Sequence, residues 1–396
     1  MRHSLFFLMD GTSMYKKVNN RLLSVVIAAG VVFSSAVLAK NPNMAVSKRD
    51  SNGDGKVSLD EWDKTEFIFN KIDFNGDGFI IAEEFAKKWG IPMPGDSSNE
   101  RSIDEAGSFD TSSTIIADVH MHPMSQHPVD QLTWMNRNGV KWAGLGSMMK
   151  SKVESYSNVM GERYIPFGGQ GAMHRIYSQY GSDGVEDDSN EMFELMMEEL
   201  EADFDNGKIK GIGEIFANNR TTNPRPDFRR KTRIDAPTYR AMLDLVEKYG
   251  GAMSMHAQWD YDSIKQLGAL ADHNPNGNII WAHCGNDGSA NDVRKVLKRH
   301  VNIYCDLSAR SKPKLSDWVI NKRPQAEIFT SYDLNESWRE LIEEMPDRFM
   351  VGTDTKGGSN YDKGIENIRN GLLANLSEET AAKVAYKNAQ KLLHLH

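Results

Sequence analysis

Short apolar runs alternate with longer amphipathic segments from residue 113 to the end of the chain. The short runs are rich in β-branched and aromatic residues and are bounded by turn-forming residues, which predicts strands. In the longer segments apolar positions recur with a period near 3.6 residues, which predicts helices. The predicted strands are 113–120, 140–146, 164–168, 208–215, 251–256, 278–283, 301–307 and 348–354.

Helices are predicted between these strands and at the C-terminus. For the helix over 236–249, Asp235 is the predicted N-cap and Pro237 lies in the first turn. The predicted helices include 191–204, 236–249, 261–271, 291–299, 336–345 and 377–393.

Strands that alternate with helices are typical of an α/β fold with a parallel sheet. Eight such units over this length predict a (β/α)8 TIM barrel. A doubly wound open sheet is the alternative, but no Gly-x-Gly-x-x-Gly motif follows a predicted strand.

The first 39 residues show a different pattern from the alternating strands and helices. Basic residues precede an apolar run over 22–33, and small residues at 36–39 precede Lys40. This order predicts a secretory signal peptide over residues 1–39, so we expect a periplasmic or secreted protein. The apolar run is short for a bilayer span, which argues against stable membrane insertion. Met14 is a more natural start of the chain than Met1.

Composition narrows the class of protein. The chain has 396 residues, of which 39% are hydrophobic and 26% charged, as in a soluble globular protein. Its net charge of −8 argues against general binding to nucleic acid. Cys284 and Cys305 fall on neighbouring predicted strands. A disulfide between them suits an oxidising compartment, but the strict geometry leaves their pairing open.

Two near-copies of one polar loop follow the predicted signal peptide, over residues 50–61 and 73–84. Each places oxygen-bearing side chains at positions 1, 3 and 5, glycine at position 6 and glutamate at position 12. Short side chains bring oxygens inward, the glycine allows a sharp bend, position 7 offers a backbone carbonyl, and the glutamate can bind with both oxygens. The predicted ligands are Asp50, Asn52, Asp54, Lys56 and Glu61, then Asp73, Asn75, Asp77, Phe79 and Glu84.

These loops resemble the EF-hand family, over residues 43–90 only, and the resemblance implies two calcium ions with a structural or attachment role. The loops begin 23 residues apart, so we expect one shared helix over 59–71 and pairing of Val57 with Ile80. The predicted domains are a signal peptide (1–39), an α-helical EF-hand pair (40–90), a linker (91–112) and the barrel (113–396).

Six metal-competent side chains occur at or near the C-terminal ends of five predicted strands. His120 and His122 are two residues apart, and side chains two apart on a strand point to the same side. In a TIM barrel the C-terminal ends of the strands form the active-site face. The predicted ligands of zinc or another divalent transition metal are His120, His122, Glu214, His256, His283 and Asp354.

Several motifs resemble the amidohydrolase superfamily over about residues 113–393. The closest likeness is to the amidohydrolase-related, metal-dependent branch that includes aminocarboxymuconate-semialdehyde decarboxylase. The glutamate on the fourth strand, Glu214, also resembles the glutamate of the TatD-like metal hydrolases. The motifs are Asp-Val-His-Met-His-Pro (118–123), Gly-Ile-Gly-Glu-Ile (211–215), Met-His-Ala (255–257), Trp-Ala-His-Cys-Gly (281–285), Val-Gly-Thr-Asp-Thr (351–355) and the closing helix over 385–393.

The resemblance implies a metal-activated water. One ion would be held by His120, His122 and Asp354. Glu214 could bridge to a second ion held by His256 and His283; in a one-metal version, His256 joins the first ion and His283 hydrogen-bonds the reactive water. Asp354 would be the general base and His283 the second catalytic residue.

The implied activity is hydrolysis of an amide, ester, lactone or phosphoester in a small molecule. A metal-dependent non-oxidative decarboxylase of the same superfamily is one alternative. A catalytically inactive, calcium-dependent scaffold is another. The sequence does not predict the oligomeric state.

A basic segment over residues 220–233 follows the fourth strand and contains one acidic residue, Asp227. Loops after barrel strands form the rim of the active site, so we expect Arg229 and Arg230 to bind a carboxylate or phosphate of the substrate. The alternative is a solvated loop whose arginines pair with acidic helices nearby.

Overall fold

The protein is described by a computed structural model in which the chain divides into two compact units, residues 1–102 and 103–396. The predicted signal peptide and nearly all of the predicted linker lie outside the described residues. Within the described ranges, no helix has the length and hydropathy needed to cross a membrane. The structure describes residues 42–73, 77–89, 111–123, 127–221, 226–355 and 358–396.

In the first unit a short antiparallel strand pair joins the two polar loops. Strand β1 (Val57–Ser58) pairs with β2 (Phe79–Ile80), and Val57 lies opposite Ile80 as predicted. Both side chains are fully buried in a small apolar core with Phe69 and Phe85. The helices of this unit are α1 (Pro42–Ser47), α2 (Glu66–Phe69) and α3 (Ala82–Trp89).

The prediction of one helix over 59–71 is wrong. A 3-10 turn spans Leu59–Glu61, and α2 begins at Glu66. The carboxylate of Glu61 accepts hydrogen bonds from the N–H and the hydroxyl of Ser58, and these cap the 3-10 turn locally. Thr65 is extended and begins a separate helix, so local capping interrupts the helical pattern.

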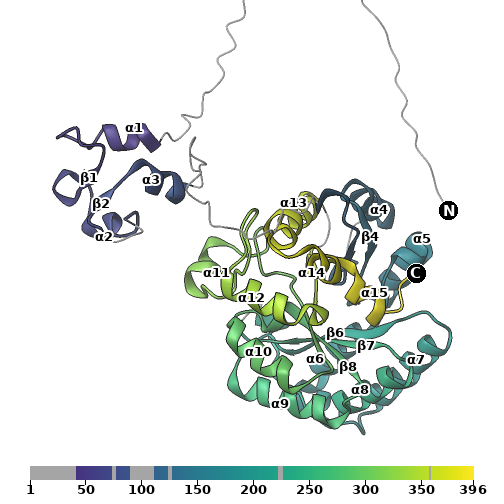
Figure 1. Cartoon of the computed structure of the whole chain (residues 1–396). Coiled ribbons are helices and arrows are strands. Elements are labelled where there is room, and N and C mark those ends of the chain that lie inside the picture. The colour runs from purple at the N-terminus through teal and green to yellow at the C-terminus, as the bar shows by residue number, and fades with distance from the viewer. Residues whose placement is uncertain (1–41, 74–76, 90–110, 124–126, 222–225, 356–357) are drawn as a thin grey trace, which may run out of the picture. The chain divides into compact units, whose positions relative to one another are not determined.

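The second unit is an α/β fold in which helices surround the strands (Figure 1), and its paired strands run parallel and in chain order. β5 to β10 form a six-stranded sheet, while β3 and β4 form a separate pair. Parallel bridges Ala143–Tyr164 and Met121–Thr355 connect the two sets, so the hydrogen-bonded neighbours form a ring. The strands are β3 (Ile116–Asp118), β4 (Val140–Ala143), β5 (Phe167–Gly169), β6 (Gly211–Asn218), β7 (Ala252–Ala257), β8 (Asn278–Trp281), β9 (Ile303–Asp306) and β10 (Phe349–Met350).

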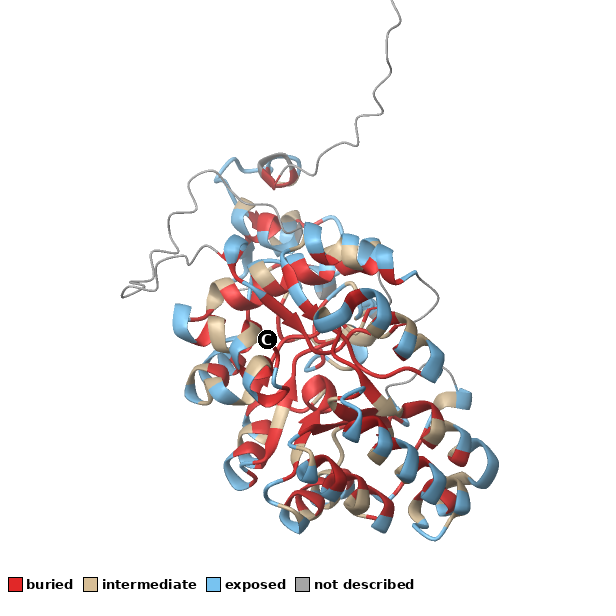
Figure 2. Cartoon of the chain, turned by 90° about the vertical axis from the view of Figure 1, so that its right-hand side faces the viewer, coloured by how far each residue is buried: buried red, intermediate tan, exposed pale blue. Residues whose placement is uncertain are grey.

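Each of the eight predicted strand ranges overlaps an observed strand, and the parallel α/β organisation is as predicted. Strand order that follows the chain around a ring is the order of a (β/α)8 barrel. Strands buried on both faces explain the continuous apolar runs. Figure 2 shows this burial along the strands, with exposed positions mainly on the surrounding helices.

The helices of the second unit occupy the intervals between strands. The helices α4, α5, α6, α11 and α13 lie outside the predicted helix ranges; the glycine-containing α6 has a kink at Gly181 (φ +71°). The helices are α4 (Pro128–Arg137), α5 (Lys150–Met160), α6 (Gln170–Glu186), α7 (Glu191–Asp205), α8 (Pro237–Lys248), α9 (Tyr261–His273), α10 (Ala290–Arg299), α11 (Asp317–Lys322), α12 (Glu336–Glu344), α13 (Ser359–Asn367), α14 (Glu378–Ala382) and α15 (Asn388–Leu392).

Two predicted helix details need correction. The N-cap of α8 is Ala236, because the carboxylate of Asp235 instead accepts the Arg233 guanidinium at 2.8 Å. The predicted final helix over 377–393 contains a π-helical turn, Lys383–Lys387, between α14 and α15.

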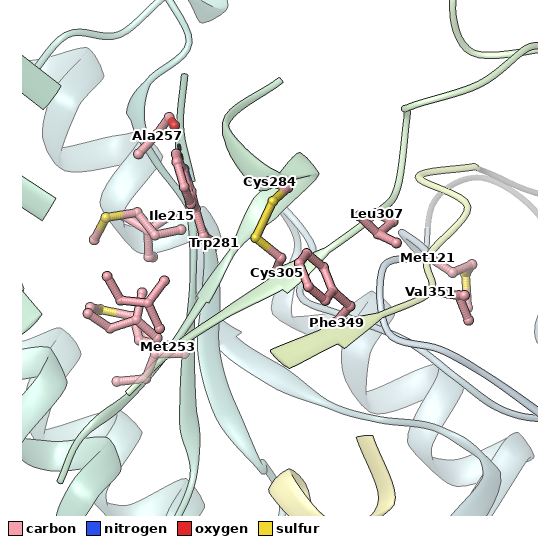
Figure 3. Close-up of a cluster of buried hydrophobic side chains, with 14 of the residues drawn as sticks. Met121, Ile215, Met253, Ala257, Trp281, Cys284, Cys305, Leu307, Phe349 and Val351 are labelled. Atoms are coloured by element: carbon pink, nitrogen blue, oxygen red, sulfur yellow. Dashed lines mark hydrogen bonds between the residues drawn. A yellow bond between two sulfur atoms is a disulfide. The ribbon is translucent and has the colours of Figure 1, made fainter. Parts of the chain in front are cut away.

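The two cysteines form a disulfide in the buried core, which settles the pairing that the sequence left open. Cys284 lies in the short turn after β8. Cys305 lies in the neighbouring strand β9, opposite Trp281. Figure 3 shows the disulfide among buried apolar side chains that include Trp281 and Phe349. The cross-link therefore joins positions next to His283 and Asp306.

Candidate metal centre

His120 and His122 follow β3 and present their Nε2 atoms to one point. These two nitrogens are 3.2 Å apart. Glu214 lies within β6 rather than at its end, because this strand continues to Asn218. His256 lies in β7. The remaining predicted ligands follow their strands, His283 in a turn after β8 and Asp354 after β10.

Five of the six predicted ligands come together in two overlapping groups. Ligand atoms of His120, His122 and Asp354 lie within 4.8 Å of one another, and so do those of His120, Glu214 and His283. The Glu214 carboxylate lies between the imidazoles: Oε2 is 3.3 Å from Nε2 of His122, and Oε1 is 3.3 Å from Nε2 of His283. This arrangement brings together nitrogen and oxygen donors from four strands.

His256 is placed differently from the other histidines. Its Nδ1 is 2.9 Å from Oε1 of Glu214, and its ring contacts that of His283 edge to face. The structure includes it in neither ligand group. Its assignment as a ligand therefore stays a prediction.

The three grouped histidines are oriented through their second nitrogen. Nδ1 of His120 is 3.0 Å from Asp306 Oδ2, Nδ1 of His122 is 3.2 Å from the Gly146 carbonyl, and Nδ1 of His283 is 2.8 Å from Ser308 Oγ. A proton on Nδ1 leaves the lone pair of Nε2 directed at the centre, as metal-binding histidines require. The donor set and its orientation fit a divalent metal ion.

Asp306, the last residue of β9, supports the centre and was missed by sequence reasoning. Its Oδ1 accepts the backbone N–H groups of His283 and Ser308, while Oδ2 faces His120. Burial alone raises the pKa of Asp306, but the interactions with His120, His283 and Ser308 bring it below its ordinary value. Its position at a strand end was the signal that could have revealed it.

His283 is held in an unusual backbone conformation. Its φ is +55° and that of Cys284 is +46°, both in the left-handed region that costs non-glycine residues of order 1–3 kcal/mol. The buried guanidinium of Arg310 donates to both carbonyls, His283 at 2.9 Å and Cys284 at 3.2 Å. Burial lowers the pKa of Arg310 to about 9. Arg310 was also missed by sequence reasoning, because only the tertiary fold brings it to this turn.

Asp354 occupies the more open side of the centre. Its side chain is 20% exposed, whereas that of His120 is fully buried. Oδ1 lies 3.7 Å from Nε2 of His122, and Oδ2 lies 3.0 Å from Nζ of Lys314, a contact that the sequence did not reveal. Burial alone raises the pKa of Asp354, but Lys314 and the nearby histidines bring it well below its ordinary value.

Charge is concentrated around His120 and Glu214. Burial alone lowers the pKa of His120, but Asp306 and Glu214 bring it well above its ordinary value. Burial alone raises the pKa of Glu214, yet His120 with its neighbouring histidines brings it well below. The pair therefore favours a cation at Nε2 of His120, where a proton and a metal ion compete.

The predicted substrate-binding arginines lie in the segment that follows β6. Arg229 is exposed, whereas Arg230 is 5% exposed. Within the basic segment, Arg233 forms a surface ion pair with Asp235, two residues further along the chain rather than on a neighbouring helix. Arg225 lies outside the described residues. A hollow of about 830 Å³ between α5 and α7 has none of the six predicted ligands in its lining.

Comparison with known proteins identifies the family. The sequence model of the family described as amidohydrolase matches residues 189–395, slightly more than half of the chain. The chain therefore belongs to the amidohydrolase family. The matched region contains Glu214, His256, His283 and Asp354. No curated protein sequence matches the chain.

Solved structures with a related arrangement share little sequence with this chain. The 2,6-dihydroxybenzoate decarboxylase from Rhizobium is 13% identical over 72% of this chain and 99% of that chain, with a TM-score of 0.41. An amidohydrolase from Burkholderia multivorans is 10% identical over 71% of this chain and 100% of that chain, with a TM-score of 0.46. A dihydroxybenzoic acid decarboxylase from Polaromonas, with bound manganese, is 13% identical over 72% and 97%, with a TM-score of 0.41.

Proposed function

We propose that this chain is a secreted or periplasmic metal-dependent hydrolase that cleaves an amide, ester, lactone or phosphoester of a small molecule on a (β/α)8 barrel. The observation that carries the proposal is the position of the Asp354 carboxylate. It lies beside the paired Nε2 atoms of His120 and His122, on the more open side of a donor cluster in which His120, Glu214 and His283 are buried.

The donor set can hold one or two divalent ions, zinc or another transition metal. His120, His122 and Asp354 would hold the first, while Glu214 and His283, joined by His256, would hold a second. When bound, the metal supplies Lewis acidity and lowers the pKa of adjacent water toward neutrality. In a one-metal arrangement, His256 would join His120, His122 and Asp354 in holding the ion, and His283 would hydrogen-bond the reactive water.

Asp354 is the proposed general base. Lys314 pairs with Oδ2, which leaves Oδ1 directed at the histidines and able to take a proton from the attacking water. The same carboxyl group then returns the proton to the leaving group. Asp306, Ser308 and Gly146 keep the imidazoles in the required orientation throughout.

Metal analysis of the purified protein, followed by a screen of amide, ester, lactone and phosphoester substrates, tests this function. We expect one or two transition-metal ions per chain and turnover that a chelator abolishes. Release of carbon dioxide from an aromatic carboxylic acid, without hydrolysis of any ester or amide, would favour the decarboxylase alternative. Metal content at background would contradict both activities and favour the inactive scaffold.

We further propose that the N-terminal unit binds two calcium ions. In the first loop the carboxylate of Asp50 accepts the backbone N–H groups of Gly53, Asp54 and Gly55, at 2.7–3.2 Å. This wraps the loop around its first residue, the arrangement that points loop oxygens inward. In the second loop Asp73 likewise accepts the N–H of Gly78 at 3.0 Å. Asn75 lies outside the described residues.

Glu61 is the proposed bidentate ligand of the first loop. Its carboxylate accepts hydrogen bonds from Ser58 and Ser51, and these lower the pKa of Glu61 to about 2. An ionised carboxylate held over the loop supports bidentate binding at position 12. Glu84 occupies the corresponding position and accepts the N–H of Ile81.

Replacing Glu61 and Glu84 with glutamine is expected to remove the rise in melting temperature that calcium causes. A bound ion stabilises the folded state by about 2.7 kcal/mol when its concentration is 100 times Kd. The measurement is thermal unfolding with and without calcium, alongside activity. The exposed neighbours Asp60 and Glu83, changed to Asn and Gln, are the matched control. Loss of activity in a folded, metal-loaded Glu variant would instead give the unit a direct catalytic or regulatory role.

A further inference from the structure

A basic hollow lies beside α6, where the chain leaves β6. It has a volume of about 540 Å³, and four of its six lining residues are cationic while none is acidic. Such a concentration of positive charge contrasts with a chain whose net charge is −8. The lining residues are Tyr177, Arg220, Thr221, Arg229, Arg230 and Lys231.

Arg230 forms the fixed wall of this basic hollow. It is 5% exposed, and its guanidinium carbon lies 3.9 Å from the ring centre of Tyr177. One terminal nitrogen donates to the Asp227 and Arg229 carbonyls, and the other is 3.0 Å from Nδ1 of His174. None of these partners is a carboxylate, so they orient the guanidinium without forming an ion pair with it.

Arg220 and Lys231 add exposed charge at the mouth. Across the described residues, no carboxylate lies within ion-pair distance of Arg220, Arg230 or Lys231, whereas Arg233 just outside the hollow is paired with Asp235 at 2.8 Å. Arg220, Arg230 and Lys231 thus line the hollow without a carboxylate partner among the described residues, and the paired Arg233 lies beyond it. This division separates a candidate anion site from ordinary surface charge.

The hollow is tied to the strand ends that carry the metal-ligand candidates. The N–H of Thr221 donates to Gln258 Oε1 at 2.7 Å, and Gln258 lies two residues beyond His256. The ring of Phe216 contacts His256 edge to face, with centroids 6.0 Å apart. Phe216 also lines a small cavity together with Arg230. Phe216 therefore contacts His256, a predicted ligand, and shares a cavity with Arg230.

We propose that the basic hollow binds an oxyanion group of the substrate, a phosphate or a carboxylate, and positions the scissile bond toward the metal centre. This inference rests on the proposed function and specifies its substrate class. Guanidinium groups match the geometry of two anionic oxygens, and Lys231 adds a point charge that attracts the ligand from solution.

The binding test uses the full chain, stripped of transition metal by a chelator so that phosphate cannot bind at the metal centre. Inorganic phosphate is titrated calorimetrically at low ionic strength. The Arg220→Gln/Lys231→Gln variant is expected to bind phosphate about tenfold more weakly, because two charged hydrogen-bond donors are lost and Arg230 stays in place. Lys295→Gln/Arg299→Gln on α10 removes the same charge elsewhere and should leave phosphate binding unchanged.

Two outcomes overturn the proposal: no phosphate binding by the wild type, or equal binding by the hollow variant and its control. A kinetic comparison on the metal-loaded protein then tests the link to catalysis. KM for an anionic ester should rise about tenfold in the hollow variant, while KM for the matching neutral ester stays constant; equal KM changes for both esters would contradict substrate binding there. If the wild type hydrolyses neither ester, the proposed hydrolase fails, and the phosphate titration still decides whether the hollow binds anions.

Discussion

Replacing His120 with alanine or Asp354 with asparagine is expected to abolish turnover. His120 belongs to both groups of ligand atoms, so its loss disrupts the whole donor cluster. Asparagine at 354 keeps the size of the side chain but cannot act as a base, and loss of a general base typically lowers the rate by about 10²–10⁴. Activity is measured on protein with a determined metal content, because the amide oxygen of asparagine is still a weak ligand.

His273 and Asp244 provide matched controls for these substitutions. They form an ion pair at the surface, 3.0 Å apart, and belong to neither ligand group. His273→Ala and Asp244→Asn should therefore retain activity. Substantial turnover by a folded His120 or Asp354 variant would rule out the assigned roles.

Asp306→Asn is expected to weaken binding of the transition metal by about 10–100-fold, the usual cost of losing a partner that orients metal-binding histidines. Both oxygens of Asp306 accept hydrogen bonds, from His120 on one side and from the N–H groups of His283 and Ser308 on the other. An asparagine has one such oxygen, so its NH2 group would face a donor. A competition titration with a chromophoric chelator measures the affinity.

The control for Asp306 is a second aspartate–histidine pair. Asp272 lies 2.9 Å from Nδ1 of His300, and its side chain is 57% exposed. Asp272→Asn should leave the metal affinity unchanged. If folded Asp306→Asn protein bound metal as tightly as the wild type, the imidazoles would not depend on this carboxylate for their orientation.

Local patterns were sufficient for the strands and for part of the candidate site. Buried parallel strands need continuous apolar runs, and these were visible for all eight strands. The two-residue spacing of His120 and His122 was enough to predict that their side chains point to the same side, and their Nε2 atoms lie together. Repetition of the polar loop was enough to predict that Val57 pairs with Ile80. Helices were less predictable where glycine or local capping interrupts the apolar period, as in α6 and around Glu61.

Contacts between segments distant in the sequence decided the remaining geometry and charge of the candidate site. The left-handed turn at His283 depends on Arg310 and Asp306, and the charge of Asp354 depends on Lys314. None of these partners is adjacent to the residue it holds, so no local pattern encodes the contact.

The sequence by itself determined which residue types stand at the strand ends, because hydrophobic period and motif spacing are properties of neighbouring residues. It also determined that the basic residues follow the strand of Glu214. Only the tertiary structure decided which cations are paired and which line the basic hollow, and which atom of each imidazole faces the centre. The physical reason is that burial, ion pairing and hydrogen-bond direction depend on where separate strands and loops meet in space.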